Sequence, residues 1–373
     1  MYLDRLQIMN YKNLREVDLT FSKSVNCLIG NNGVGKTNLL DAIYYLSFTK
    51  SRMVTNDVQN ITWEEEMMFI KGLYHPYDHQ DDIEIHCGIK KRQSKTLKKN
   101  GKEYDRITDH IGLVPLVIVS PADHELIEGG GEERRKFING VISQYDRVFF
   151  QHYMNYVKAL AQRNTLLKVY DTLQYEMWEE RIAAASDYIF KARVDFLEKF
   201  VPLFQEFYNF ISESNETVSL SYRTNFHEET DFFQLLLDSR EKDIQRGFTT
   251  VGVHRDDLEM LLSNYPLRRV GSQGQCKTYL IALKLAQYVF LSIIAKKRPI
   301  LLFDDIFDKL DASRVSKIID LINNDERFGQ IFITDTDRQH ISSILRQHVS
   351  DYKIFSVDKG VVTEQNQDDY EEE

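Results

Sequence analysis

The strongest constraint on this chain is a glycine-rich segment between a strand and a helix. Residues 30–37 read GNNGVGKT, which fits the pattern GxxxxGK[ST]. The apolar run from Val25 to Ile29 predicts a central strand before it, and apolar residues at helical spacing follow from Leu39 to Leu46. Glycines let backbone N–H groups turn toward phosphate oxygens, and a helix N-terminus adds positive potential. The motif predicts nucleotide binding rather than a structural turn.

Each residue of this segment, the P-loop, has an expected role with ATP and Mg²⁺ as cofactors. The residues expected to surround the phosphates are Gly30, Asn31, Asn32, Gly33, Val34 and Gly35. Lys36 is expected to reach the terminal phosphates and to act in catalysis, and the hydroxyl of Thr37 is expected to coordinate Mg²⁺. The sequence therefore predicts a complete phosphate site within eight consecutive residues.

A pair of carboxylates follows a second buried strand. The apolar run from Ile300 to Phe303 predicts that strand, and Asp304 and Asp305 come directly after it. A carboxylate at the tip of a buried strand is costly unless it meets a cation. Asp304 is therefore the expected Mg²⁺ ligand of Walker B type, and Asp305 is expected to orient or deprotonate the attacking water. The alternative is a helix-capping pair before Ile306.

A third segment, GSQGQ at residues 271–275, precedes a helix predicted near residues 275–296. Ser272 and Gln275 form S-x-x-Q, a capping box that can begin any helix. A helix N-terminus with a serine and a close-approaching glycine, here Gly274, is also an anion site. Taken alone, this segment leaves both interpretations open.

The pattern along the chain predicts an α/β domain split by a helical insertion. Residues 1–131 and 247–363 show strand and helix patterns, whereas 132–246 is rich in aromatic residues and is expected to be helical. Residues 364–373 are strongly acidic and are expected to form a disordered tail. One apolar stripe of the insertion steps by three or four residues, although Pro202 should kink or interrupt its helix: Phe196, Phe200, Phe204, Phe207 and Ile211.

Charge at first argues against a nucleic-acid partner. The chain has 57 acidic and 47 basic residues, a formal net charge of −10. Six of the acids lie in the last ten residues, so the rest of the chain is close to balanced. Residues 90–102 carry seven Lys or Arg and no acid on a predicted hairpin that turns at Asn100-Gly101. Such a run is either solvated surface or a contact for DNA phosphates.

The remaining composition is that expected of a cytoplasmic protein. No apolar run approaches the 18 or so residues that span a bilayer, and the first residues lack a long apolar signal segment. The three cysteines, Cys27, Cys87 and Cys276, are far apart and form no CxxC pair. This pattern speaks against a disulfide framework and a zinc site. We expect no membrane partner.

Together, these motifs resemble the ABC-type ATPase head, and further segments resemble the RecF family of DNA-repair ATPases. Those segments are LQIMNYKNLREVDLTF near the N-terminus, SPADHELIEGGGEERRKFIN, ALAQRNTLLK, GVHRDDLE at 252–259, GSQGQ, and LLFDDIFDKLD at 301–311. The resemblance covers the chain to about Asp358 and implies a mixed sheet with flanking helices. It departs from the family at Val253, where proline is usual, and at Asp335, where a second threonine is common.

The resemblance also implies how the site is completed. In the family, ATP lies between two heads, so Ser272, Gly274 and Gln275 would contact the γ-phosphate held by the other protomer. Residues 310–311 would lie at that interface, and Thr334 matches a catalytic switch position that is often histidine in transporters. The chain would then be a slow, DNA-stimulated ATPase that dimerises with ATP.

In the cell, the resemblance implies a role in recombinational repair and replication-fork or gap processing, including recombinase loading and the SOS response. RecR-like and RecO-like proteins, and DNA with single- to double-strand junctions, would be its partners. Two rival interpretations are an ATPase subunit of a transporter and an SMC-like structural clamp. The large helical insertion and the basic hairpin argue against the first, and the lack of sustained heptads argues against the second.

Several other residues have two interpretations. Lys12 and Asn13 lie either beside the nucleotide or in an exposed turn. His254 and Arg255, next to two aspartates, are expected to form a charged structural contact between the two lobes rather than a ligand site. The basic segment 134–136 either meets DNA phosphates or forms a solvated helix face.

Overall fold

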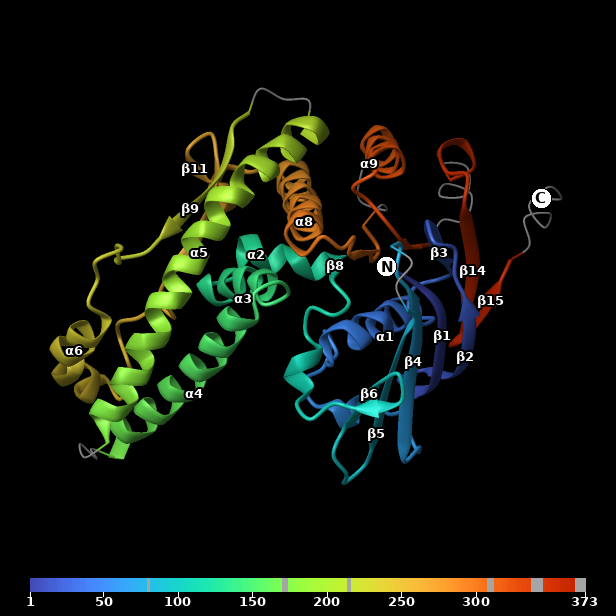
Figure 1. Ribbon diagram of the computed structural model, residues 1–373. Helices are drawn as coiled ribbons and strands as arrows, with labels where there is room; N and C mark the ends of the chain where they lie inside the picture. The colour runs from blue at the N-terminus through green and yellow to red at the C-terminus, as the bar shows by residue number, and fades with distance from the viewer. Residues whose placement is uncertain (79–80, 170–173, 213–215, 307–311, 337–344, 366–373) are drawn as a thin grey trace. The chain divides into compact units, whose positions relative to one another are not determined.

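The structure is a computed structural model that describes residues 1–78, 81–169, 174–212, 216–306, 312–336 and 345–365. The chain forms two compact units, each with its own sheets and helices (Figure 1). The first unit comprises Met1–Ala122 and Gln287–Glu373, and the second comprises Asp123–Ala286.

A largely parallel sheet of six strands forms the centre of the first unit, in the order β15-β14-β3-β13-β12-β8. Its strands are β3 (Val25–Ile29), β8 (Leu116–Val119), β12 (Ile300–Phe303), β13 (Ile331–Asp335), β14 (Tyr352–Asp358) and β15 (Val361–Glu364). Only β15 among them runs antiparallel to its neighbour. Every residue of β3, β12 and β13 is buried, as expected for central strands of a parallel sheet. The carboxyl ends of these three strands meet at one edge.

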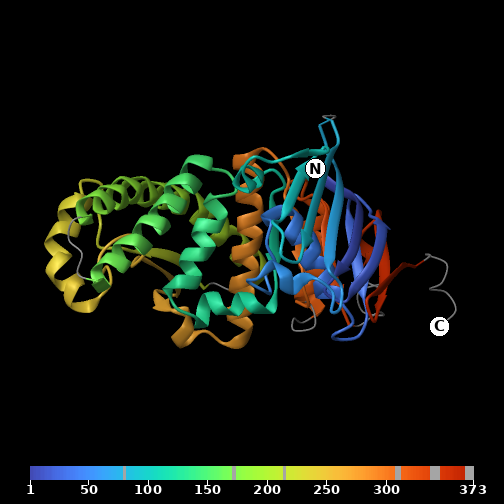
Figure 2. The ribbon, with the colours of Figure 1, turned by 90° about the horizontal axis from the view of Figure 1, so that it is seen from below.

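The N-terminal strands form an antiparallel sheet in the order β2-β1-β4-β5-β6-β7. They are β1 (Tyr2–Tyr11), β2 (Leu14–Thr20), β4 (Met67–His75), β5 (Ile83–Lys90), β6 (Thr96–Lys99) and β7 (Lys102–Glu103). Blue to cyan colours mark these strands, which lie side by side in Figures 1 and 2. Asn100 and Gly101 have φ of 47° and 79° and join β6 to β7, which confirms the predicted tight turn.

Helix α1 (Lys36–Phe48) packs against strands of both sheets in the first unit. Its apolar face, Leu39, Leu40, Ile43 and Leu46, is fully buried in one core with residues from both sheets. Burial of this face fixes the helix directly after the P-loop. Among the described residues, this unit also contains the helices η1 (Asp57–Asn60), η2 (Ile107–His110) and α9 (Ala312–Asn324).

Helices dominate the second unit, as the aromatic-rich sequence predicts. They are α2 (Glu125–Glu128), α3 (Gly131–Ile142), α4 (Arg147–Val169), α5 (Tyr175–Ser212), α6 (Phe232–Arg246) and α7 (Leu267–Val270). Helices α4 and α5 pack side by side (Figure 1). The predicted stripe from Phe196 to Ile211 is buried, and α5 continues through Pro202 rather than ending there. The chain passes between the units at η3 (Pro121–His124) and again within α8 (Gln273–Ala295).

The second unit differs from the predicted insertion in content and boundaries. It contains a three-stranded sheet, β11-β10-β9, of β9 (Val218–Arg223), β10 (Asp257–Leu262) and β11 (Tyr265–Pro266). The expectation that residues 132–246 are wholly helical is therefore wrong at β9. Because β10 pairs with β9 along its whole length, residues 247–286 join this unit instead of the head. The tail predicted from residue 364 begins within β15, and residues 366–373 lie outside the described part of the chain.

Ion pairs engage the two aspartates of the GVHRDDLE segment. Arg193 binds Asp256 at 3.3 Å, with both side chains 2% exposed. Arg134 makes a two-pronged contact with Asp257, from Nε at 2.8 Å and Nη2 at 2.9 Å. Arg135 donates to the backbone carbonyl of Asp256. These contacts confirm a structural role for the segment, and they engage the guanidinium groups that could otherwise meet DNA.

His254, in the same segment, makes hydrogen bonds with both ring nitrogens. Its Nε2 faces the carbonyl oxygen of Thr249 at 3.1 Å, so this nitrogen carries the proton and donates. Its Nδ1 then accepts from the hydroxyl of Tyr156 at 2.5 Å. Burial, the largest cause, lowers the His254 pKa to about 4, and Arg255 and Arg135 lower it further against the opposing effect of Thr249.

The low pKa of His254 predicts acid sensitivity of the second unit. An unfolded histidine titrates near 6.5. Between about pH 6.5 and pH 4 the unfolded chain binds a proton that the folded chain does not. The free energy of unfolding should therefore decrease as the pH is lowered across this window. The contribution of His254 is up to about 1.4 kcal/mol per pH unit. Urea unfolding measures this free energy. In a Trp63→Phe background, the fluorescence of Trp178 reports on the second unit alone.

The matched variant is His254→Gln, which does not titrate. Its loss of stability between pH 7 and pH 5 should be smaller than that of the parent, because the remaining titrating groups are common to both proteins. Equal losses in the two proteins would contradict this assignment.

Candidate functional site

The P-loop lies between β3 and α1, as the sequence predicts. Gly33 and Gly35 have φ of 80° and 124°, a region that side chains other than glycine rarely adopt. A Cβ atom on Gly35 would also come within 2.8 Å of the Asn13 side chain. Gly35 is the N-cap of α1, and no side chain caps this helix. The first N–H groups of α1 are thus available to an anion.

Lys36 folds back over the loop that precedes it. Its Nζ donates to the carbonyl oxygens of Gly30 at 2.5 Å and Asn31 at 3.1 Å. The side chain is 6% exposed. By contrast, Asn31, Asn32 and Gly33 are exposed at the tip of the loop. The loop therefore holds its one lysine within reach of the space that the backbone N–H groups face.

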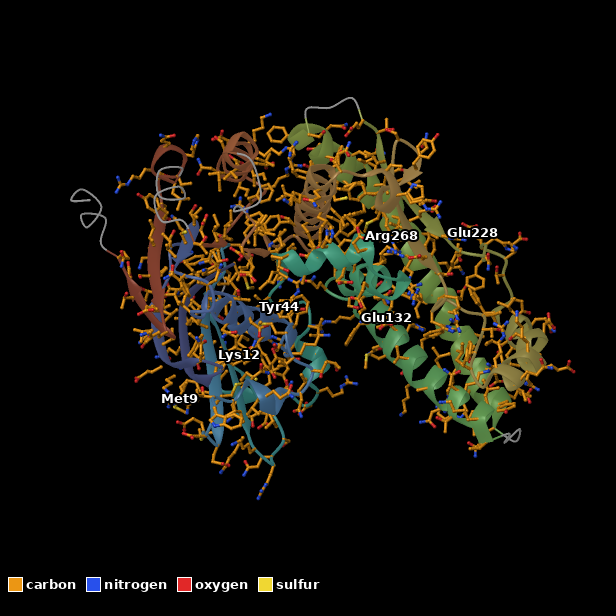
Figure 3. All side chains as sticks on the ribbon, turned by 180° about the vertical axis from the view of Figure 1, so that it is seen from behind. Met9, Lys12, Tyr44, Glu132, Glu228 and Arg268 are labelled. Carbon is orange, nitrogen blue, oxygen red and sulfur yellow. The ribbon has the colours of Figure 1, made fainter. Side chains whose placement is uncertain are left out.

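Lys12 and Asn13 support this loop and do not form an exposed turn. Asn13 donates to the carbonyl of Val34 at 2.9 Å and accepts from the side chain of Asn38 at 2.7 Å. Lys12, labelled in Figure 3, binds the buried Asp41 of α1 at 2.5 Å. Sequence reasoning missed Asn38 and Asp41, although Asp41 is a carboxylate on the buried face of a predicted helix, a position that demands a partner.

Asp304 connects the P-loop helix to the central sheet. Its Oδ1 accepts from the hydroxyl of Thr37 at 2.9 Å and from that of Thr334 at 3.1 Å. These residues are far apart in sequence but meet because β3, β12 and β13 are adjacent and parallel. Burial is the largest effect on the Asp304 pKa and raises it, against the two hydroxyl contacts. A nearby cation would relieve that cost.

The oxygen set at this point fits Mg²⁺. One hydroxyl and one carboxylate lie together beside the P-loop, and Mg²⁺ prefers oxygen ligands shared between one or two protein groups and phosphates. No cluster of three or more His, Cys, Asp or Glu suited to a metal occurs among the described residues. A site built on Thr37 and Asp304 does not need one, since phosphate and water supply the other ligands.

Asp305 and Thr334 lie next to this pair. Asp305 has a φ of 54°, and its backbone N–H donates to the Thr334 hydroxyl at 2.8 Å. Thr334 is 1% exposed, and its hydroxyl contacts both aspartates, the backbone N–H of Asp305 and the carboxylate of Asp304. Asp335, the departure from the family pattern, is buried at the end of β13 and accepts the Gly30 N–H through its backbone carbonyl. The backbone contact does not depend on the side chain at 335.

Ser272, Gly274 and Gln275, the residues expected to contact the nucleotide of the other protomer, lie in the second unit. Gln275 accepts from the Ser272 N–H through Oε1 at 2.7 Å, and its own N–H donates to the Ser272 hydroxyl oxygen at 3.2 Å. The predicted capping box is thus present at the start of α8, with Gly274 in its first turn. Ser272 is exposed, so the same turn remains open to an anion. Residues 310–311 lie outside the described residues.

Comparison with known proteins identifies the family. A family model described as RecF/RecN/SMC N terminal domain matches residues 2–363. The DNA replication and repair protein RecF of Bacteroides thetaiotaomicron is 52% identical over 98% of this chain and 99% of its own length. The chain belongs to the RecF family. RecF of Bacteroides fragilis is 50% identical over 98% of both chains.

Solved structures agree with this family assignment. One described as the recombination mediator protein RecF-ATP in the RecFOR pathway is 30% identical, covers 98% of both chains and has a TM-score of 0.87. An Smc head domain from Pyrococcus furiosus, 18% identical over 99% of this chain and 97% of its own with a TM-score of 0.59, shares the fold. The predicted ABC-type head, an α/β fold split by a helical segment, is confirmed. RecF family proteins act in DNA replication and repair.

The basic residues of segment 90–102 in this RecF family chain differ in exposure and pairing. Lys90, Arg92 and Lys102 are exposed. Lys95 instead binds Asp57 at 2.8 Å and donates to the carbonyl of Thr49 at 2.5 Å, with its side chain 16% exposed. Lys95 thus ties the hairpin to the C-terminal end of α1. The exposed cations are the ones available to a partner.

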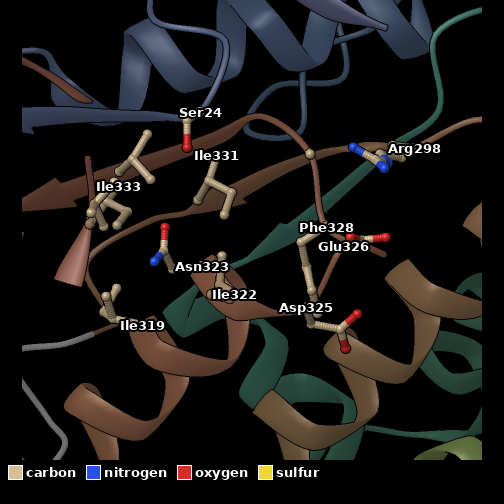
Figure 4. A pocket seen from close by; sticks show the side chains of 13 residues that line it. Ser24, Arg298, Ile319, Ile322, Asn323, Asp325, Glu326, Phe328, Ile331 and Ile333 are labelled. Atoms are coloured by element: carbon tan, nitrogen blue, oxygen red, sulfur yellow. The ribbon is translucent and has the colours of Figure 1, made fainter. Parts of the chain in front are cut away.

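A pocket of about 220 Å³ lies at the opposite edge of the parallel sheet (Figure 4). Its apolar floor comes from Ile319 and Ile322 of α9 and from Ile331 and Ile333 of β13. Ile331 is the first residue of β13, whereas Thr334 and Asp304 lie at or just after the carboxyl ends of their strands. This pocket is therefore separate from the P-loop site.

Helix α8 bears on the expectation that no segment spans a membrane. Of the helices that the structure describes, it alone is long and apolar enough to cross a membrane by length and composition. Lys277 and Lys284 interrupt the apolar run, which is why counting consecutive apolar residues missed it. Within its apolar window, 78% is buried in the protein, as in the core helix of a globular domain.

Proposed function

We propose that this chain is an Mg²⁺-dependent ATPase that dimerises when it binds ATP and loosens its contact with DNA after hydrolysis. The observation that carries this proposal is the contact between Thr37 of the P-loop helix and Asp304 at the end of β12. It joins a phosphate-binding loop to a metal-binding carboxylate. The homologous solved structure is described as RecF-ATP, which supports ATP as the nucleotide.

In this proposal each residue of the first unit has one task. The N–H groups at the start of α1 bind the phosphates, and Lys36 exchanges its loop carbonyls for the terminal phosphate. Thr37 and Asp304 would hold Mg²⁺, which supplies charge neutralisation on the phosphates when bound. Asp305, fixed by its N–H bond to Thr334, orients or deprotonates the attacking water.

Dimerisation follows from the signature turn, residues 271–275. Its exposed Ser272 is suited to the γ-phosphate of ATP held by a second protomer, as the family resemblance implies. If contacts to one γ-phosphate come from two protomers, ATP favours the dimer over the monomer by linkage. Hydrolysis removes that preference. Gly274 and Gln275 complete the turn around the serine.

DNA contact is proposed for the exposed face of the antiparallel sheet. Across its strands, Lys71 lies next to His86, and His86 lies next to Lys98. Burial is the largest cause that lowers the His86 pKa, and Lys98 and Lys71 lower it further against the opposing effect of Glu84, which pairs with Lys71. Lys90, Arg92 and Lys102 add exposed positive charge. We therefore propose that this region binds the phosphate backbone of DNA and makes no contacts with the base edges.

The cellular role we propose is that of the family. It comprises recombinational repair and replication-fork or gap processing in the cytoplasm, recombinase loading at single- to double-strand junctions, and the SOS response. RecR-like and RecO-like proteins are the proposed partners, in keeping with a homologue described in the RecFOR pathway. Stimulation of a slow ATPase by DNA is part of the same proposal.

Replacing Asp305 by Asn should separate ATP binding from hydrolysis. The variant should bind ATP and accumulate as a dimer, with a turnover rate lower by about 10²- to 10⁴-fold, because the group that activates water is lost. Asn tolerates the positive φ of 54° at this position, so the backbone should not be strained. Sedimentation velocity with saturating ATP measures the dimer.

Lys36→Met is the matched control, since it should lose ATP-dependent dimerisation. A monomeric Asp305→Asn chain in saturating ATP would show that Asp305 is not the hydrolytic residue.

Reversing charge at Lys90, Arg92 and Lys102 should weaken DNA binding. Each lost phosphate contact should flatten the plot of log affinity against log salt by up to about 0.9. Lys95 is left unchanged because its pairing with Asp57 supports the fold. The control reverses three exposed lysines of the second unit, Lys158, Lys168 and Lys242. Unchanged affinity and salt slope in the hairpin variant would remove this face from the DNA site.

A further inference from the structure

A carboxylate from a distant part of the second unit contacts the signature turn. Glu216, which precedes β9, accepts a hydrogen bond through Oε1 from the Nε2 of Gln275 at 2.6 Å. The contact is partly buried and spans 59 residues of sequence. Neither the family motifs nor the sequence pattern singles out Glu216. It is therefore a candidate for control of the turn from outside the motif.

Both the oxygen and the nitrogen of the Gln275 side-chain amide form hydrogen bonds. Its oxygen accepts from the Ser272 N–H, and its nitrogen donates to Glu216. A carboxylate can only accept, so Glu216 requires the amide nitrogen to face it. The amide oxygen must then face the Ser272 N–H. If the amide were flipped, two donors would face each other at Ser272 and two acceptors would face each other at Glu216.

The fixed amide determines what Ser272 offers to a ligand. Gln275 uses the Ser272 N–H, and the Gln275 N–H uses one lone pair of the Ser272 hydroxyl. In this part of the chain, as far as the structure describes it, the hydroxyl makes no other hydrogen bond. Its proton is therefore the group that remains for an anion. With the amide oriented by Glu216, the turn presents one O–H donor in a set direction.

The second carboxylate oxygen of Glu216 is also hydrogen-bonded. Its Oε2 accepts from the hydroxyl of Tyr208 at 3.0 Å, and Tyr208 is fully buried on α5. The Tyr208 ring packs against that of Tyr279 on α8, whose hydroxyl donates to the carbonyl of Ser219 in β9. Helix α5, strand β9 and helix α8 thus share one set of contacts. The carboxylate has little freedom to leave Gln275.

We propose that Glu216 is a positioning residue for the signature turn. It orients the Gln275 amide so that Ser272 directs its hydroxyl at the γ-phosphate of ATP held by a second protomer. This inference rests on the proposed ATP-dependent dimer. A negative charge close to a phosphate is unfavourable by itself, so the benefit of Glu216 comes from hydrogen-bond direction and not from charge.

Two substitutions separate hydrogen-bond direction from charge. Glu216→Ala removes the acceptor and frees the amide to rotate. Glu216→Gln keeps an acceptor oxygen for Gln275, and its own amide nitrogen can donate to Tyr208. Glu198→Ala, which removes an exposed carboxylate from α5, is the control for loss of an acid elsewhere in this unit.

The experiment uses the full chain in the Asp305→Asn background and measures dimerisation by sedimentation velocity over a range of ATP concentrations. Glu216→Ala should raise the dimer dissociation constant by about tenfold for each of two equivalent sites, roughly a hundredfold in total. Glu216→Gln should restore it to within about threefold of the parent. ATP binding to the monomer, measured with a fluorescent ATP analogue, should be unchanged in both, which also shows that the first unit is folded.

Three outcomes would overturn the proposal. If Glu216→Ala dimerises like the parent, Glu216 has no positioning role. If Glu216→Ala and Glu216→Gln are weakened equally, amide orientation is not the cause. If the parent itself stays monomeric with ATP, the proposed dimer fails and the role of Glu216 fails with it. Only that last result contradicts the proposed function as well. A thermal melt of each variant identifies any loss that comes from unfolding.

Discussion

The hydrogen bond between Thr37 and Asp304 is the contact on which the site depends. It requires helix α1 to begin near the carboxyl end of β3 while Asp304 directly follows β12. One strand, β13, lies between β3 and β12 in the sheet. The parallel pairing of β3, β13 and β12 supplies that arrangement, and the buried face of α1 holds the helix against it. Burial makes Asp304 costly as an anion without a cation, which suits it to a metal shared with phosphates.

Local sequence predicted the elements of the first unit because its signals are strong over short distances. The apolar run before the P-loop, the glycines within it and the acidic pair after Phe303 each identify one strand end. The Asn100-Gly101 turn carries its own conformational signal. Partners at long range could not be read in this way. Asn13 contacts the P-loop, and Thr334 bridges two aspartates, only because of how the strands are ordered.

The second unit was harder to predict for a related reason. Strand β9 is short and follows a long aromatic helix, so its alternating pattern gave a weak signal beside that helix. Its pairing with β10 moves the signature turn and the GVHRDDLE segment into the same unit as α5. The signature turn spans five residues of sequence, 271–275. Glu216 contacts it from outside this segment, and Tyr208 contacts Glu216. Short motifs identify the chemistry, and the surrounding fold determines its geometry.

In the proposed dimer, one ATP is held by the P-loop of one protomer and the signature turn of another. Mixing a Ser272→Arg chain with a Lys36→Met chain tests it most directly, with sedimentation velocity and bound ATP measured together. Neither chain alone should dimerise with ATP. The mixture should form a heterodimer with about one ATP, because the intact P-loop and the intact signature turn then meet at one site. A mixture that stays monomeric, or a Ser272→Arg chain that dimerises alone, would contradict this shared ATP site.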